Sequence, residues 1–110
     1  MRVIFALLLA GVSIAWGADP VPERLYAERC SGCHGDRGGG DGPAAAALIP
    51  KPKNFRDPAY WKDRSLESLH GIVKKGKPGT MMPGFDGILG DVEIDAVLRY
   101  LQRFATDTTK

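Results

Sequence analysis

The spacing of apolar residues along the chain predicts helices that are separated by loops rich in glycine and proline. Two stretches repeat apolar residues every three or four positions, as one buried helix face does. The first predicts a helix that Ser65 caps and Gly76 ends, and the second a helix from residue 90 or 91 to about 104. Pro22 should open a third helix that runs into Cys30, because proline is tolerated in a first turn. No segment alternates like a strand, so the expected fold class is all-α. The two apolar stripes are Leu66, Leu69, Ile72 and Val73, and Ile94, Val97, Leu98, Leu101 and Phe104.

The segments between these helices predict only short elements. Residues 44–48 are expected to form one helical turn, whereas residues 49–53 should be extended because alternating prolines exclude a helix. Asp57 followed by Pro58 is typical of the N-cap and first position of a short helix. The polar segment 105–110 is expected to fray.

The N-terminus has the composition of a secretory signal peptide. A positive start at Met1-Arg2 precedes an apolar run, and the small residues Gly17-Ala18 follow it. The run is shorter than the roughly 20 apolar residues that a transmembrane helix needs. We therefore expect residues 1–18 to be cleaved, to within one residue, and residues 19–110 to form one mature domain in the periplasm. An uncleaved N-terminal anchor that leaves the domain facing the periplasm is the alternative.

The charge of the mature chain is close to neutral. The full chain has 15 basic and 13 acidic residues, and loss of Arg2 leaves 14 against 13, a net charge of +1. This balance disfavours nucleic-acid binding, which usually requires a clear basic excess. A mature chain of about 90 residues also buries little core by itself. A large apolar prosthetic group would offset that shortage.

Residues 30–34 read Cys-Ser-Gly-Cys-His, the attachment signature of a c-type haem. Each thiol can add to one vinyl group of the same haem, and His34 then lies against the ring, where its imidazole can bind iron. A redox or strained structural disulfide between Cys30 and Cys33 is one alternative. A zinc site is another, although the chain offers only His70 as a fourth ligand. His70 as a second axial ligand is less favoured by its spacing than a histidine that faces solvent.

The loop after this motif contains five glycines within residues 35–43. Glycine lets backbone approach a flat macrocycle closely, and a carbonyl near Pro43 is the natural acceptor for the second ring N–H of His34. The same loop lacks the Gly-Lys-Ser/Thr context of a phosphate-binding loop. Further along, the indole N–H of Trp61 could reach a haem propionate, and packing at the rim is an equal alternative.

Two methionines, Met81 and Met82, lie in a polar loop framed by glycine and proline. A thioether is a soft iron ligand, and opposite a histidine it raises the reduction potential. A methionine that fills a gap in the core is the alternative, but this loop is a poor place for one. The three lysines just before the loop either steer an acidic partner or form a solvated helix end. They are Lys74, Lys75 and Lys77.

Taken together, these motifs resemble the small class I c-type cytochromes of the bacterial monohaem kind, over essentially the whole mature chain. The resemblance implies a class I cytochrome c fold, with three to five helices wrapped around one covalently attached haem c. It points to Met82, before the proline, as the sixth ligand, and to the carbonyl of Pro43 in Gly42-Pro43 as the acceptor for the axial histidine. It also implies that the first and last helices cross with Tyr26 and Tyr100 in contact. A glycine is usual where this chain has Pro22, so a looser or shifted crossing is expected.

The resemblance implies a single-electron carrier rather than an enzyme. Cys30 and Cys33 would tether the haem, and His34 and Met82 would fill both axial positions of the iron, leaving none for a substrate. Met81 in place of Met82 stays open, as do two other functions: a haem subunit of a larger oxidoreductase complex, and a haem enzyme or sensor with a displaceable sixth ligand. The expected partners are redox proteins, whose identity the sequence does not give, and the protein is expected as a monomer or as a complex subunit.

Overall fold

The computed structural model describes residues 3–4, 6, 10–11 and 20–107. Most of the expected signal peptide, including its junction with the mature domain, lies outside these residues. The described residues form helices and turns and no strand, which confirms the all-α fold class. None of their helices is long and apolar enough to cross a membrane. The elements are α1 (Pro20–Arg29), α2 (Ser31–His34), the 3₁₀ turn η1 (Ala45–Ala47), α3 (Pro58–Trp61), α4 (Leu66–Lys75), α5 (Asp91–Gln102) and the 3₁₀ turn η2 (Arg103–Thr106).

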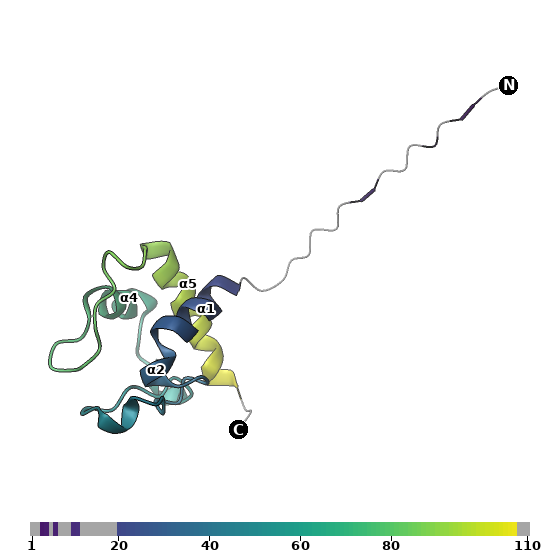
Figure 1. Cartoon of the computed structure of the whole chain (residues 1–110). Coiled ribbons are helices and arrows are strands. Elements are labelled where there is room, and N and C mark those ends of the chain that lie inside the picture. Colours follow the sequence, from purple (N-terminus) through teal and green to yellow (C-terminus); the bar gives the residue numbers. More distant parts are fainter. Residues whose placement is uncertain (1–2, 5, 7–9, 12–19, 108–110) are drawn as a thin grey trace.

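Helix α5 is the central element of the domain, and both α1 and α4 pack against it (Figure 1). Its apolar stripe is buried as predicted, with Ile94 fully inaccessible to solvent. Burial of such a stripe is the main favourable contribution to folding. The rest of the core comes from the other helices, from the segment before α3 and from the loop before α5. The buried cluster consists of Tyr26, Phe55, Leu69, Phe85, Leu89, Ile94, Val97, Leu98, Leu101 and Phe104.

Two helices begin where a side chain accepts a hydrogen bond from a backbone N–H group that would otherwise be unpaired. The Ser65 hydroxyl accepts from the amide of Ser68 at 3.1 Å, which fixes the start of α4. The Asp57 carboxylate accepts from the amide of Ala59 at 3.0 Å, which starts α3 with proline in its first turn. These starts confirm the predicted caps.

The crossing of α1 and α5 has the aromatic contact that the resemblance implied. The rings of Tyr26 and Tyr100 have their centroids 5.6 Å apart, and the exposed fraction of Tyr26 is 2%. The looser crossing expected from Pro22 is therefore not seen at the aromatic pair. Pro22 lies in the first turn of α1, one turn before Tyr26, so its ring does not separate the contacting residues.

The C-terminus is ordered further than the sequence suggested. Residues 105 and 106, expected to fray, belong to η2, where the Thr106 hydroxyl donates to the carbonyl of Arg103. The element is held because Phe104 is buried and packs on the backbone of Gly38. The segment 108–110 lies outside the described residues.

A cluster of charged side chains joins α4 to α5 on the surface. His70 lies between two carboxylates of α5, with Nδ1 2.7 Å from Asp95 Oδ1 and Nε2 3.0 Å from Asp91 Oδ1. Lys74 adds an ion pair to Asp91 at 3.2 Å. The hydrogen bond that His70 donates to Asp95, and to a smaller extent the one that it donates to Asp91, raise the pKa of His70 above 6.5, and the bond from His70 lowers the pKa of Asp91 below 3.8.

This cluster predicts a pH-dependent contribution to stability. Because the pKa of His70 is raised on folding, its contribution is complete below pH 6.5 and disappears as the pH rises through the folded pKa. The contribution of Asp91 is complete above pH 3.8 and disappears as the pH falls through its lowered pKa. We expect His70→Gln to lower the melting temperature most between these two values, and the gap from the wild type to close toward pH 9. A gap of constant size from pH 5 to pH 9 in thermal melts would contradict this.

Candidate cofactor site

One cavity, of about 190 Å³, opens between α2, the segment 48–55, α4, α5 and the loop of residues 77–85, which we call the methionine loop. Its walls are mainly apolar, so it can hold a large hydrophobic group away from water. Helices α4 and α5 line the cavity with apolar side chains. On α4, Ile72 and Val73 are only half-buried by the protein because they face this cavity. The wall residues on these two helices are Leu69, Ile72 and Val73 of α4, and Val97, Leu98 and Leu101 of α5.

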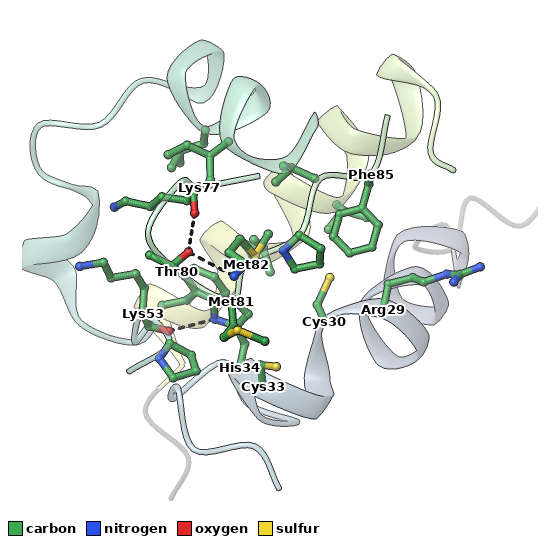
Figure 2. A pocket seen from close by; sticks show the side chains of 18 of the residues that line it. Arg29, Cys30, Cys33, His34, Lys53, Lys77, Thr80, Met81, Met82 and Phe85 are labelled. Carbon is green, nitrogen blue, oxygen red and sulfur yellow. Dashed lines mark hydrogen bonds between the residues drawn. The ribbon is translucent and has the colours of Figure 1, made fainter. Parts of the chain in front are cut away.

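The Cys-x-x-Cys-His motif forms one short helical turn at the edge of this cavity. Backbone bonds close the turn, with the amide of His34 donating to the carbonyl of Cys30 at 3.0 Å. Cys30, Cys33 and His34 all line the cavity, and Figure 2 shows them grouped on one side of it. Both thiols are unbridged. Burial, with a smaller effect from Cys33, raises the pKa of the Cys30 thiol to about 11, so this thiol is neutral at physiological pH.

The structure gives the zinc alternative no support. His70, the one further histidine, is hydrogen-bonded to the carboxylates of Asp91 and Asp95 on α5 and does not line the cavity. Among residues 20–107 and the few described before them, no three histidine, cysteine or acidic side chains gather as a metal site.

The side chain of His34 is held by a segment that the sequence did not indicate. Its Nδ1 lies 3.1 Å from the carbonyl oxygen of Lys53, and because a carbonyl only accepts, Nδ1 carries the proton. The imidazole also stacks on the ring of Phe55, with centroids 4.4 Å apart and planes 21° apart. Burial lowers the pKa of His34, and the bond to the Lys53 carbonyl acts in the opposite direction. A neutral imidazole with its proton on Nδ1 leaves the Nε2 lone pair available to a metal.

The expected role of the Pro43 carbonyl is thus wrong in this structure. The chain at residues 42–44 runs along the back of α2, where the amide of Ala44 donates to the carbonyl of Gly32 at 2.9 Å. A Cβ on Gly42 would lie 2.4 Å from that same carbonyl oxygen, so only glycine fits there. Pro43 itself is exposed and does not line the cavity.

The glycine-rich loop instead lets the segment before α3 pass close to the motif. A Cβ on Gly40, whose φ is +74°, would lie 2.6 Å from the carbonyl oxygen of Pro52. Next to it, the amide of Phe55 donates to the carbonyl of Gly38 at 2.7 Å. The glycines therefore bring backbone next to backbone, and this approach places the Lys53 carbonyl at His34.

Trp61 belongs to this segment as well. Its indole N–H donates to the carbonyl of Phe55 at 2.8 Å, and it does not line the cavity. The expectation that it binds a propionate is therefore not met, and the alternative of packing at the rim describes it better. Phe55 and the Lys53 carbonyl are the site components that the sequence analysis missed. The one signal was an aromatic residue two positions after the extended segment 49–53.

The two methionines both line the cavity but differ in burial. Met82 is half-buried and packs against the core, whereas 71% of Met81 is exposed. The backbone of Met82 is held at both ends: its amide donates to the Thr80 hydroxyl at 3.2 Å, and its carbonyl accepts from the amide of Lys77 at 3.2 Å. The Thr80 hydroxyl in turn donates to the Lys77 carbonyl at 2.7 Å (Figure 2).

The methionine loop is fastened to the end of α4. The amides of Phe85 and Asp86 donate to the carbonyls of Val73 and Lys74, at 2.9 and 3.0 Å. At the helix end the approach is close, since a Cβ on Gly76 would lie 2.8 Å from the amide nitrogen of Gly84 and 3.0 Å from the Met82 carbonyl oxygen.

The residues around the cavity fit a covalently attached haem. Two thiols on one turn match its two vinyl groups, and an imidazole and a thioether are both iron ligands. The apolar walls match the body of the macrocycle.

Comparison with known proteins also supports a covalently attached haem as the cofactor. The family described as cytochrome c oxidase, cbb3-type, subunit III matches residues 18–101. Dihydro-heme d1 dehydrogenase of Pseudomonas aeruginosa is 35% identical over 92% of this chain, which spans only 19% of that relative. Cytochrome c55X of Paracoccus denitrificans is 28% identical over 94% of this chain and 95% of its own length. The structure of the KustC0563 c-type cytochrome is 26% identical and superposes with a TM-score of 0.63, covering 76% of this chain and 95% of that one.

The contact between α4 and the methionine loop predicts different effects for two alanine substitutions. Gly76 and Gly79 have almost the same φ, +79° and +78°, but a Cβ at Gly79 meets nothing within 4 Å. Both variants place alanine at a positive φ, which strains the backbone, and only Gly76→Ala must also push Met82 and Gly84 away from α4. We expect faster amide hydrogen exchange at Phe85 in Gly76→Ala and unchanged exchange there in Gly79→Ala. Equal exchange in the two variants would show that the loop does not depend on this contact.

Proposed function

Because this chain belongs to the c-type cytochrome family, we propose that it carries single electrons in the periplasm through one haem, with His34 and Met82 as the axial ligands of the iron. As a member of that family it binds haem c covalently and serves in electron transfer. When bound, the haem supplies an iron that exchanges one electron between its ferric and ferrous forms. The ligand pair, the compartment and the status as a carrier rather than an enzyme are the parts that we propose.

The observation that carries this proposal is that His34 and Met82 line the same apolar cavity as the two thiols of the attachment turn. In our proposal Cys30 and Cys33 form the two thioether bonds, and His34 offers Nε2 to the iron. Met82 offers its thioether from the opposite loop. Two protein ligands fill the axial positions, which leaves no site for a substrate and favours a carrier over an enzyme.

Met82 is the better candidate of the two methionines. Its side chain packs against the core and its backbone is held by Lys77 and Thr80, so little ordering is needed to bring the sulfur to the iron. Met81 is mostly exposed, and its use would first require the loop to turn.

The cavity mouth favours partners with an acidic surface. Of the described residues that line the cavity, the charged ones are all basic: Arg29, Lys51, Lys53 and Lys77. The mature chain is expected at a net charge of only +1, so positive charge is concentrated around the opening through which electrons would pass. Such a patch steers association with an oppositely charged protein.

A second candidate function is that of a haem domain within a larger oxidoreductase. It is favoured by the similarity to dihydro-heme d1 dehydrogenase, of which this chain spans less than one fifth. The similarity to cytochrome c55X over nearly its whole length favours the separate carrier.

If the protein is a separate carrier, it should be small and exported and should contain covalently bound haem. In a periplasmic extract we expect the haem absorbance to elute from a sizing column near the mass of one copy of residues 19–110. Mass spectrometry of that fraction after acid denaturation should give this polypeptide, to within one residue at its start, plus one haem. Elution with a much larger complex would favour the second candidate function. A mass equal to that of the polypeptide without haem would contradict both candidate functions, because each requires covalently bound haem.

The ligand proposal predicts opposite outcomes for two neighbouring substitutions. Met82→Ala should abolish the weak far-red band of sulfur-ligated ferric haem and admit carbon monoxide to the ferrous iron. It should also lower the reduction potential by on the order of 0.1 V or more, within the roughly 0.8 V that axial ligands span. Met81→Ala should leave all three properties unchanged. If Met81→Ala shows the loss and Met82→Ala does not, Met81 is the ligand.

A further inference from the structure

We propose that Trp61 and Phe55 are positioning residues for His34, acting through the segment 53–55, so that they set the orientation of the axial imidazole and, with it, the potential of the iron. This inference rests on the proposed function, in which His34 binds the iron. It assigns new roles to two aromatic residues, one of which lies outside the cavity.

The segment 53–55 makes two contacts with the side chain of His34. The Lys53 carbonyl accepts the Nδ1 proton at 3.1 Å, and the Phe55 ring stacks on the imidazole with a centroid separation of 4.4 Å. A hydrogen bond alone leaves the ring plane free to tilt about the donor direction. The stacked phenyl ring restricts that tilt, so the two contacts together fix both the tautomer and the plane.

Phe55 is itself held by hydrogen bonds at both its backbone amide and its backbone carbonyl. Its amide donates to the Gly38 carbonyl at 2.7 Å, and its carbonyl accepts from the Trp61 indole at 2.8 Å. Its ring is 6% exposed and contacts Tyr60 and Trp61, with centroids 5.4 and 6.1 Å apart. Phe55 therefore has a fixed position from which to hold a ligand.

The hydrogen bond to His34 affects the reduction potential of the iron that His34 would bind. A partner that accepts the second N–H of a ligating histidine fixes the ring and raises its basicity. A more basic imidazole stabilises the ferric form and lowers the reduction potential. Loosening the segment weakens the Nδ1–H···O contact, so it must shift the equilibrium toward the ferrous form and raise the potential.

Trp61→Phe is the sharpest test, because it keeps an aromatic ring and removes the indole donor, at a residue that does not line the cavity. In the holoprotein we expect the ferric–ferrous equilibrium to move about threefold toward ferrous, about 30 mV upward at 59 mV per tenfold for a one-electron couple. The pattern of haem methyl shifts in the ferric NMR spectrum, which reports the imidazole plane, should change with it.

Phe55→Leu and Phe104→Leu form a matched pair for the second residue. Phe55 and Phe104 are equally buried, at 6% and 7%, and both contact the backbone of Gly38, so a disturbance of Gly38 is common to both variants. The ring contacts of Phe104, however, are with Tyr26 and Tyr100, whereas the ring of Phe55 stacks on His34. Both variants should lower the melting temperature. Only Phe55→Leu should raise the potential and change the methyl shifts, by at least as much as Trp61→Phe.

An unchanged potential in Trp61→Phe and Phe55→Leu, or equal shifts in Phe55→Leu and Phe104→Leu, overturns the inference. So does a downward shift, because that is the sign expected if water reaches the iron. In all of these cases a wild-type protein with covalent haem and the far-red band leaves the proposed function intact. A wild-type protein without covalent haem would instead remove the proposed function first.

Discussion

A single turn of helix places two thiols and one imidazole on the same wall of the cavity, and the rest of the domain is arranged around that constraint. Because the amide of His34 donates a hydrogen bond to the carbonyl of Cys30 across one helical turn, the two residues move together. Tyr26 ties the turn to the main helix pair: its hydroxyl donates to the carbonyl of Gly35, directly after His34, while its ring packs against Tyr100 of α5. The helix crossing thus supports the attachment turn as well as closing the core.

The walls of the cavity are joined by backbone packed against backbone, which is why glycine recurs at each junction. Gly42 lies against α2, Gly40 against the carbonyl of Pro52, and Gly84 against the last carbonyls of α4, all at distances that a Cβ would not allow. Side chains of ordinary size would separate these segments, so the apolar walls and the ligand loop would no longer meet. In a domain this small, such direct contact replaces much of the core that a longer chain would supply.

Local rules predicted most of the fold, because helices, caps and the attachment motif depend on residues within one or two turns of each other. Ser65, Asp57 and the apolar stripe of α5 were all identified in this way. The acceptor for His34 was not, because Lys53 is 19 residues away and offers a main-chain carbonyl, which leaves no mark on the residue type. The order of η2 likewise depends on a tertiary partner, the backbone of Gly38, and the position of Trp61 depends on the main-chain carbonyl of Phe55, which no residue type reveals.

The two faces of the cavity are held with unequal strength, and this bears on the choice between a carrier and a sensor. On the His34 side, a helical turn, a carbonyl, a stacked ring and, in our proposal, two covalent bonds act together. On the other side, Met82 depends on a short loop fastened by a few backbone bonds to the end of α4. Local opening starts where such bonds are few and exposed, so in our proposal the methionine would be the ligand that leaves first. If the iron is bound as we propose, the stability of the junction between α4 and its loop would determine whether it keeps both ligands, as a carrier requires, or opens a position to small molecules.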